Sequence, residues 1–321
     1  MKDSWIIFRR KKIRMSDPVN NGILNISKEA GYTSFDVVAV VRGVYRQRKC
    51  GHTGTLDPMA TGVLPVALGK ATKVCGMLTD WDKEYEAELL LGRTTDTLDV
   101  TGEDNGGNPE AAMNLDEDSI RAAVLKYRGV IEQIPPMYSA LKKDGRRLYD
   151  IARSGGVVER QARTVTIHSI EVLAIEKPIV KIRVLCSKGT YIRSLCDDIG
   201  RDLQCGGCMK SLKRTAVGPF NISNAVSLDM IKKLRDEGRE DELMGCLMPL
   251  DMVFAGLGKL TVKQDSEKML SNGNKLSSDD VETDIVPSDH ERFRIYHHDG
   301  SFAAVYEYDS ASNMYKPYRM F

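Results

Sequence analysis

The sequence predicts a mixed α/β fold in which a mainly antiparallel sheet is flanked by helices and followed by a small β module. Three stretches, 83–91, 165–175 and 179–187, alternate between polar and apolar residues, as half-buried strands do. Two other stretches place apolar residues at helical spacing, and Ser34 and Thr190 stand where helix N-caps are expected. Strands and helices are therefore expected to intermix along one chain.

Length and composition divide the chain into three parts. A chain of 321 residues suffices for one large domain and one small domain, and 28% charged with 42% hydrophobic residues is ordinary for a globular protein. We expect a basic tail at 1–19, the main domain at 20–248 and a strand-rich module at 249–321. The acidic stretch 238–242 is typical of a surface connector that precedes such a module.

The apolar stretches argue against membrane insertion and secretion. The apolar run at 5–8 is too short to span a bilayer, and no other stretch free of charges is long enough. Residues 1–19 lack the apolar core of a secretory signal. The cytoplasm is therefore the expected location.

The cysteines indicate reduced thiols rather than a disulfide framework, because there are seven of them and several lie within apolar segments. Cys205 and Cys208 have the spacing of half a zinc site, but no second cysteine pair or histidine pair stands nearby in the sequence. A tight loop is therefore favoured for this pair, and no metal is expected.

Charge is distributed unevenly along the chain, although the net charge is only +1. Residues 1–73 carry 13 Lys and Arg against 5 Asp and Glu, whereas residues 236–321 carry 9 against 17. A polyanion bound at the basic end would fit this asymmetry, and so would a soluble protein with an uneven surface charge.

A polar, glycine-rich loop at 51–58 stands directly before the apolar stretch 63–68. Pro58 favours an extended backbone at Asp57, which would fix a carboxylate beside a core strand. Such a carboxylate suits an active site, and the alternative is a turn residue that caps its own loop.

The segment 137–163 interleaves basic and aromatic residues and is broken by glycines. Its tyrosines include Tyr138 and Tyr149, and its basic residues are Lys142, Lys143, Arg146, Arg147, Arg153, Arg160 and Arg163. This pattern suits a clasp for nucleic acid, and a solvated helical hairpin would produce a similar pattern.

Five blocks of sequence, in one order and with one spacing, resemble the TruB family of pseudouridine synthases over about residues 20–220. The first is GHTGTLDPMATGVLPVALGKATK at 51–73, and the others lie at 82–97, 133–142, 186–195 and 212–215. The resemblance implies a fold of the pseudouridine-synthase type in a catalytic domain at 20–248. It also implies that 137–163 is an insertion that clasps RNA and, more faintly, that 249–321 is a PUA-like β domain.

The activity implied by the resemblance is the isomerisation of a uridine in the T loop of tRNA, at position 55, to pseudouridine. The base flips out, its N1–C1′ bond breaks, and the uracil rejoins through C5. The family's acidic residue corresponds to Asp57, whose ionised carboxylate either attacks C1′ or removes the 2′ proton. No redox change or group transfer occurs, so no cofactor is expected.

The resemblance also assigns two partners to Asp57. Arg193 matches an arginine that pairs with the carboxylate, and the alternative is a surface pair with Asp197 on the same helix. Tyr85 matches a tyrosine that stacks on the flipped uracil and is implicated in the deprotonation of C5. The alternative for Tyr85 is an ordinary strand tyrosine in the core.

Other matched positions are expected to bind the substrate. His52 matches a histidine that fills the space left by the flipped base, while Tyr191 and Leu212 match the uracil pocket and would otherwise pass as core residues. Lys28 matches a lysine of the first family block, where the usual Lys-Pro pair is here Lys28-Glu29. Contacts to the RNA backbone are expected from Lys142, Lys143, Arg146, Arg147 and Arg214.

The expected partner is the T arm of tRNA, bound by a monomer without guide RNA or an obligate protein partner. Affinity is expected from the basic N-terminal half and 137–163, because the acidic module at 249–321 is poorly suited to phosphate. Two alternatives stay open: a tRNA-binding or tRNA-folding factor, and a guide-RNA-dependent member of the family. The insertion and the short C-terminal module argue against the second.

Overall fold

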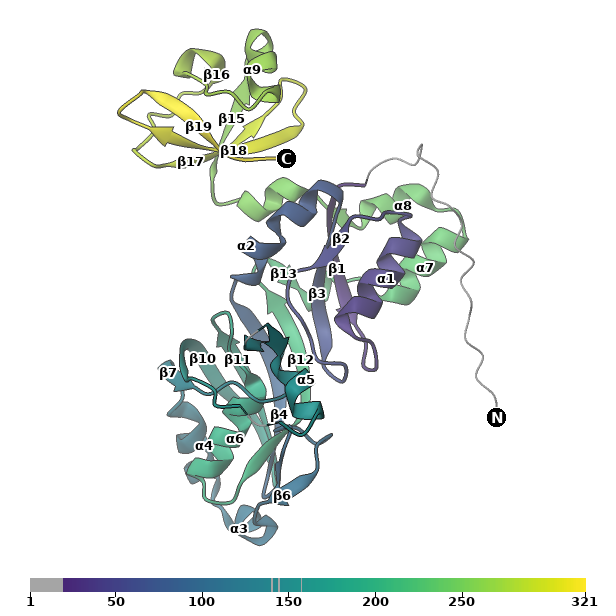
Figure 1. Cartoon of the computed structure of the whole chain (residues 1–321), viewed down its shortest axis with the longest axis vertical. Coiled ribbons are helices and arrows are strands. Elements are labelled where there is room, and N and C mark those ends of the chain that lie inside the picture. Colours follow the sequence, from purple (N-terminus) through teal and green to yellow (C-terminus); the bar gives the residue numbers. More distant parts are fainter. Residues whose placement is uncertain (1–19, 140, 144, 157) are drawn as a thin grey trace.

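The computed structural model describes residues 20–321 except 140, 144 and 157. The basic tail predicted at 1–19 lies outside the described residues. Figure 1 shows three parts along the long axis: a five-stranded sheet at one end, a middle part around β1, β2 and β3, and a further part around β4, β10 and β11. The predicted mixed α/β fold is confirmed, because the largest sheet is mainly antiparallel and helices flank it.

The main sheet has ten strands in the order β14–β1–β3–β12–β4–β11–β10–β7, with β2 added to β3 and β13 added to β12. The pairs are antiparallel except for β3 and β12, which are parallel in the described chain. The strands are β1 (Gly22–Lys28), β2 (Cys50–His52), β3 (Thr61–Leu68), β4 (Lys83–Leu91), β7 (Gly129–Gln133), β10 (Arg163–Glu176), β11 (Ile179–Cys186), β12 (Gly207–Val217), β13 (Phe220–Asn221) and β14 (Leu247–Met248).

The parallel contact between β3 and β12 joins the two halves of this sheet. Gly62 on β3 has φ +100, and a Cβ there would lie 2.1 Å from the backbone oxygen of Arg214 on β12. Only glycine permits this approach together with this backbone conformation. The close contact between β3 and β12 therefore requires glycine at position 62. In the sequence, this residue is simply one of the glycines in the block 51–73.

Each half of the sheet is covered by its own helices. On one half, α1 (Ser34–Val44) packs against β2 and β3, α7 (Leu228–Asp236) against β1, and α8 (Glu240–Gly245) against α7 and β14. On the other half, α4 (Glu117–Leu125) packs against β10 and α6 (Ile192–Asp202) against β12 and β4. Tyr85 and Leu212 contact the buried side chains of both halves. These two residues therefore lie at the centre of the domain.

Two predicted helix caps are wrong by one residue. Thr33, not Ser34, caps α1: its side chain accepts a hydrogen bond from the Asp36 backbone N–H, and the Asp36 carboxylate accepts one from the Thr33 backbone N–H. Tyr191, not Thr190, is the N-cap residue of α6, and it makes no side-chain cap. The Thr190 hydroxyl instead donates to the Ser187 carbonyl oxygen at 3.0 Å. At α1 two good capping residues are adjacent, whereas at α6 the threonine is used in the preceding turn and the helix begins after a residue that caps poorly.

The remaining elements of the main domain are short. They are η1 (Gly69–Val74), α2 (Cys75–Thr79), β5 (Thr94–Thr95), β6 (Asp104–Gly106), α3 (Pro109–Asn114), β8 (Lys142–Lys143), β9 (Arg146–Arg147), α5 (Leu148–Arg153) and η2 (Ile222–Asn224). The segment 137–163 thus contains a small β-hairpin followed by one helical turn and a half, rather than a helical hairpin. Within the described residues, no helix is both long and apolar enough to cross a membrane.

A second sheet occupies the C-terminal part, in the order β16–β15–β17–β18–β19. Its strands are β15 (Gly258–Val262), β16 (Val281–Glu282), β17 (Arg292–Tyr296), β18 (Phe302–Asp309) and β19 (Met314–Met320), with η3 (Leu250–Phe254), η4 (Gln264–Ser266), α9 (Glu267–Ser271) and η5 (Ser278–Asp280) beside them. The rings of Phe254, Phe302 and Phe321 stack between this sheet and the main domain. Its assignment as a PUA-like domain stays a prediction.

Candidate active site

The loop that contains Asp57 connects β2 to β3 and is held from several sides. The backbone N–H of Leu56 donates to Ser34 Oγ at 2.9 Å, and the same hydroxyl lies 3.2 Å from the Leu56 carbonyl oxygen. The backbone N–H of Ala60 donates to the Asp57 carbonyl oxygen at 3.1 Å. The first residue of α1 therefore fixes the position directly before the carboxylate.

Lys28 holds the same loop from beneath and is not placed to touch a substrate. Its side chain is buried, with 1% of the residue exposed, and its ammonium donates to the carbonyl oxygens of Glu29, Tyr32 and Pro58 at 2.7–2.9 Å. Burial lowers the pKa of Lys28 to about 8, and the charge of Asp57 opposes that fall. All three donors of the ammonium are in use, which favours a positioning role, while the expected substrate-binding role stays a prediction.

Arg214 supports the loop from the β12 side, and its burial favours this role over the expected contact to RNA, which stays a prediction. Only 2% of the residue is exposed, and Nε donates to the Val63 carbonyl oxygen at 2.7 Å. The two terminal nitrogens donate to the carbonyl oxygens of Gly54 at 3.3 Å and Thr55 at 3.5 Å. The guanidinium therefore satisfies irregular backbone of the 53–60 loop and faces no solvent.

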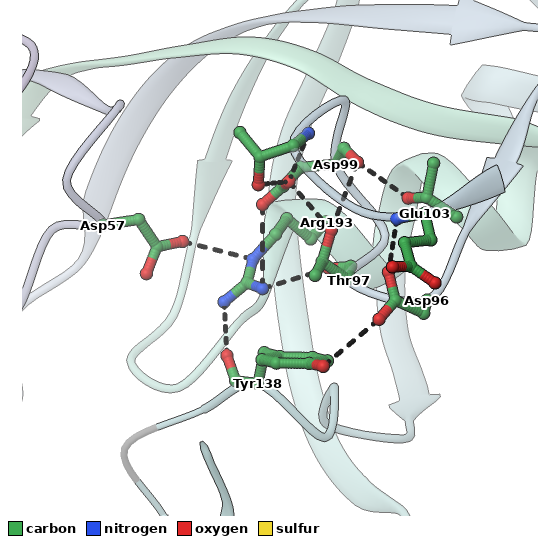
Figure 2. Close-up of polar contacts among 9 residues, drawn as sticks. Asp57, Asp96, Thr97, Asp99, Glu103, Tyr138 and Arg193 are labelled. Carbon is green, nitrogen blue, oxygen red and sulfur yellow. Dashed lines mark hydrogen bonds and ion pairs between the residues drawn. The ribbon is translucent and has the colours of Figure 1, made fainter. Parts of the chain in front are cut away.

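Arg193 of α6 reaches across the site to Asp57 (Figure 2). Nε of Arg193 lies 3.1 Å from Asp57 Oδ2, while its terminal nitrogens donate to the carbonyl oxygens of Thr97 at 3.1 Å and Tyr138 at 2.7 Å. The Arg193 side chain is 7% exposed, whereas that of Asp57 is 42% exposed. The carboxylate is thus oriented from the protein side and open on the other side.

The alternative partner of Arg193 is ruled out by the same geometry. Asp197 pairs with Arg201 on the surface of α6, and Asp198 pairs with Arg201 at 3.2 Å. The contact of Arg193 with Asp57 uses one nitrogen rather than two, because the rest of the guanidinium is committed to backbone carbonyl groups.

A tight turn at 96–103 positions Arg193, and its contribution was not anticipated from the sequence. Asp99 Oδ2 lies 3.8 Å from Arg193, and Asp99 Oδ1 accepts from the Thr97 hydroxyl at 2.9 Å and the Thr101 backbone N–H at 3.0 Å. Asp96 accepts from the Tyr138 hydroxyl at 3.2 Å. The sequence did contain a clue to this turn, because Asp96 and Thr97 belong to the family block at 82–97, where no chemical role was assigned to them.

Tyr85 and Leu212 face the same region from β4 and β12, where Tyr85 pairs with Arg214 and Leu212 pairs with Ala87 across the sheet. Both are half-buried. Burial raises the pKa of Tyr85; the charge of Asp57 adds to the rise and that of Arg214 opposes it. The phenol is therefore neutral near pH 7 and presents a ring rather than a charge.

Tyr191 is held through its backbone and its ring. Gln133, fully buried at the end of β7, donates to the Tyr191 carbonyl oxygen at 3.0 Å and accepts from the Tyr191 N–H at 2.8 Å. The guanidinium carbon of Arg163 lies 4.7 Å from the centre of the Tyr191 ring. Gly189 has φ +82, and a Cβ there would lie 3.3 Å from that same carbon. Because Gly189 has no side chain, the Arg163 guanidinium has the space to lie over the Tyr191 ring.

His52 is half-buried at the end of β2, and burial lowers its pKa, so the imidazole is neutral near pH 7. Its ring contacts Phe35 edge to face, with centroids 5.4 Å apart and planes at 84°. Nδ1 of His52 accepts a long hydrogen bond, 3.4 Å, from the Gly54 backbone N–H. Phe35 was not singled out from the sequence, where it is one more apolar residue of the first helix.

The segment expected to clasp RNA begins beside the site, since the Tyr138 carbonyl oxygen accepts from Arg193. Arg146 is exposed on β9, and Arg160 donates to the Pro135 carbonyl oxygen at 3.0 Å. The side chains of Lys142, Lys143 and Arg147 lie outside the described residues. Their predicted contacts to RNA stay predictions.

The cysteines form no disulfide: all seven are free. Cys205 and Cys208 flank the tight turn at Gly206, which has φ +81. In the described part of the chain, no group of three or more His, Cys, Asp or Glu side chains is arranged to hold a metal ion.

Comparison with known proteins agrees with this geometry. Residues 42–192 match the N-terminal domain of the TruB family pseudouridylate synthases, and residues 193–255 match the tRNA pseudouridylate synthase B C-terminal domain. A relative from Lachnoclostridium phytofermentans named tRNA pseudouridine synthase B is 48% identical over 94% of this chain and 99% of that protein. This chain belongs to the TruB family. Another TruB family relative of the same name, from Clostridium kluyveri, is 41% identical over 89% of this chain and 94% of that protein.

Two solved structures share the fold of this TruB family enzyme. A chain from an H/ACA RNP bound to a substrate RNA containing 2′-deoxyuridine is 26% identical, with a TM-score of 0.68 over 94% of this chain and 86% of that one. A chain from a Cbf5-Nop10-Gar1 complex is 28% identical, also with a TM-score of 0.68, over 94% and 85%. The enzyme is thus an isomerase that converts uridine to pseudouridine.

Proposed function

We propose that this enzyme isomerises one uridine in the T loop of tRNA, at position 55, to pseudouridine. The class of RNA follows the name that relatives 41–48% identical to this chain share, tRNA pseudouridine synthase B. The single observation that supports Asp57 as the reactive group is its contact with Arg193. An otherwise exposed carboxylate is oriented by a buried guanidinium, as a group that must meet a substrate requires.

The chemistry leaves the RNA with the same atoms. The N1–C1′ bond breaks, the uracil turns within the pocket, C5 bonds to C1′, and the proton displaced from C5 leaves while N1 gains one. Asp57 acts at the sugar, either by attack on C1′ or by removal of the 2′ proton. Arg193 keeps the carboxylate in one orientation through both bond changes, since its other donors are fixed on Thr97 and Tyr138.

Tyr85, Tyr191 and Leu212 are assigned to the uracil pocket. Tyr85 stacks on the flipped base, because a half-buried neutral phenol offers an aromatic face at the centre of the sheet. Because its pKa is raised, the Tyr85 hydroxyl is protonated at neutral pH. It can accept the proton from C5 only if it gives up its own hydroxyl proton at the same time. Tyr85 is therefore a relay in that step rather than a resident base.

The enzyme recognises the T arm by its shape and by its sugar-phosphate backbone. The hairpin β8–β9 and the rest of 137–163 carry basic residues on a segment that contacts Arg193 at Tyr138, so we expect affinity to depend strongly on salt. We assign the protein to the guide-independent type and to the cytoplasm. It resembles proteins named tRNA pseudouridine synthase B at 41–48% identity, and chains from guide RNP structures at 26–28%. Function as a monomer is part of the same proposal.

The test is pseudouridine formation on an unmodified tRNA transcript, with no guide RNA added, by wild type and by Asp57→Asn. Product at a single T-loop uridine with wild type only supports the reaction, the site and the role of Asp57 together. Asp229→Asn, an exposed carboxylate on α7, is the matched control and should retain full activity. Tight binding of tRNA without product from wild type would instead favour a tRNA-binding factor.

A further inference from the structure

The aromatic pair of Phe35 and His52 is a feature of the site that the reaction chemistry leaves unused. We propose that Phe35 and His52 together form a stacking site for one unpaired base of the T loop, next to the uridine that is isomerised. The inference rests on the proposed function, and it adds Phe35 as a residue that binds and positions the RNA.

Exposure is the first observation. Phe35 is 65% exposed, which is unusual for its residue type, and among the described phenylalanines it alone is classed as an exposed large side chain. Met59, two residues after Asp57, is 62% exposed. Two large apolar side chains are thus exposed close to the reactive carboxylate, Phe35 on α1 and Met59 in the loop itself.

The second observation is that the Phe35 ring is tied to the position of Asp57. Phe35 follows Ser34, whose hydroxyl holds the backbone of Leu56, and Leu56 directly precedes Asp57. The capping box of Thr33 and Asp36 fixes the turn on which Phe35 stands. A base resting on this ring would therefore keep a defined distance from the reacting sugar.

The third observation is the line of contact between α1 and β2. Phe35 and Arg42 are seven residues apart, so they share one face of α1. Phe35 contacts His52, and Arg42 donates to the Cys50 carbonyl oxygen at 3.2 Å. Arg42 is exposed, so the line presents an aromatic contact near Asp57 and positive charge farther along the helix.

RNA is the partner that this combination fits. Unpaired bases stack on aromatic side chains while arginines contact the neighbouring phosphates. His52 adds a ring and not a charge, because burial keeps it neutral near pH 7. A protein partner would require a much larger apolar surface than one phenylalanine beside a histidine.

The experiment measures binding of a T-arm hairpin by Phe35→Ala, Phe35→Leu and Phe35→Tyr. Each variant is made in the Asp57→Asn background, so that the RNA remains unconverted. Loss of one stacked base corresponds to about a 5-fold to 100-fold rise in Kd, which we expect for Phe35→Ala and Phe35→Leu. Phe35→Tyr retains the ring and is expected to restore most of the affinity. Met230→Ala, an exposed apolar residue on α7, is the matched control.

A set of hairpins, each with one abasic T-loop position, identifies the base. For one position the abasic hairpin and Phe35→Ala should be non-additive, because both remove the same stack. Equal Kd values for wild type and Phe35→Ala, or full additivity at every position, would overturn the inference. If Phe35→Ala lowered the midpoint of thermal unfolding and Phe35→Tyr did not restore binding, Phe35 would be a structural residue.

These outcomes are separate from those of the proposed function. With Asp57 intact, pseudouridine formation by wild type tests the reaction independently of Phe35. A wild-type enzyme that forms product while Phe35→Ala binds the hairpin normally would contradict only the stacking site. An enzyme that forms no pseudouridine on tRNA would contradict the proposed function first.

Discussion

Arg193 is buried while its partner Asp57 is only half-buried, and a single nitrogen, Nε, joins them at 3.1 Å. The other side of the guanidinium is spent on the carbonyl oxygens of Thr97 and Tyr138. Arg193 therefore fastens three separate stretches of chain at one point: the 53–60 loop, the 96–103 turn and the start of 137–163. Movement of any one of these stretches would therefore change the orientation of the Asp57 carboxylate.

Arg193→Lys should bind the T-arm hairpin within about threefold of wild type but lose at least about 100-fold in the single-turnover rate. An ammonium is a compact charge and cannot reach a carboxylate and two carbonyl groups in the directions that a planar guanidinium serves. Rapid-quench measurement of pseudouridine at saturating enzyme gives the rate. Arg201→Lys, on the same helix but in a surface pair, is the control. Weaker binding with a normal rate would show that Arg193 serves RNA affinity instead.

Asp99→Asn should reduce the single-turnover rate by about 10-fold, less than Arg193→Lys, with an unchanged Kd. The amide still accepts at Oδ1 from the Thr97 hydroxyl and the Thr101 N–H, but the negative charge 3.8 Å from Arg193 is gone. Combining the two substitutions should give little more than Arg193→Lys alone, because both act through one guanidinium. Independent, multiplying effects would place Asp99 outside this network.

Lys28→Met tests the positioning of the loop through its dependence on pH. Burial lowers the pKa of Lys28 from 10.5 to about 8. Between those values the unfolded chain binds the extra proton, so the contribution of Lys28 to the free energy of unfolding rises with pH, by about 3 kcal/mol in all. The difference between wild type and Lys28→Met should therefore grow from pH 8 to pH 10.5. Chemical denaturation across that range measures it, and a flat difference would contradict the buried ammonium.

Gly189→Ala should disturb Tyr191 through Arg163. The new methyl group would meet the guanidinium at 3.3 Å and occupy a backbone conformation, φ +82, that costs a non-glycine residue about 1 kcal/mol or more. We expect a several-fold higher KM for tRNA, since the ring assigned to the uracil pocket is displaced. Gly238→Ala, also at positive φ but with nothing nearby, shares the backbone cost and is the control. Equal KM values for the two variants would count against the role of the Arg163 contact.

Arg146→Gln should lower the salt dependence of T-arm binding. If Arg146 contacts one phosphate, the slope of log K against log salt should fall by about 0.7 to 0.9. Lys316→Gln in the C-terminal sheet, where Lys316 pairs with Asp309, should leave the slope unchanged. Binding of a labelled hairpin is measured by fluorescence anisotropy at salt concentrations from about 50 to about 300 mM. The series gives the slope of log K against log salt for each variant. The reverse ranking would move the RNA contact to the acidic module.

Much of the fold was accessible from periodicity. The alternation at 83–91 corresponds to β4, in which Ala87, Leu89 and Leu91 are buried while the glutamates between them face outward. The helical spacing after Tyr191 corresponds to α6, whose apolar side packs on β12. Such patterns predict the element correctly because a strand or a helix buries one side against the core in any fold.

The order of the sequence blocks indicated the family and the carboxylate, but the tertiary structure decided what the cations do. Lys28 and Arg214 were expected to meet the substrate and RNA, yet both are buried and donate to backbone carbonyl groups in and around the 53–60 loop. Residue type alone cannot reveal this, because a lysine or an arginine suits phosphate and backbone carbonyl oxygen equally well.

The physical reason lies in the irregular loop itself. Several of its carbonyl groups lie outside the sheet ladders and are satisfied by buried donors from distant strands, here Lys28 of β1 and Arg214 of β12. The sequence by itself therefore indicated several strands and helices and singled out Asp57 as the candidate reactive group. Only the tertiary structure decided which side chains hold that aspartate in place and which, like Phe35, stay exposed beside it.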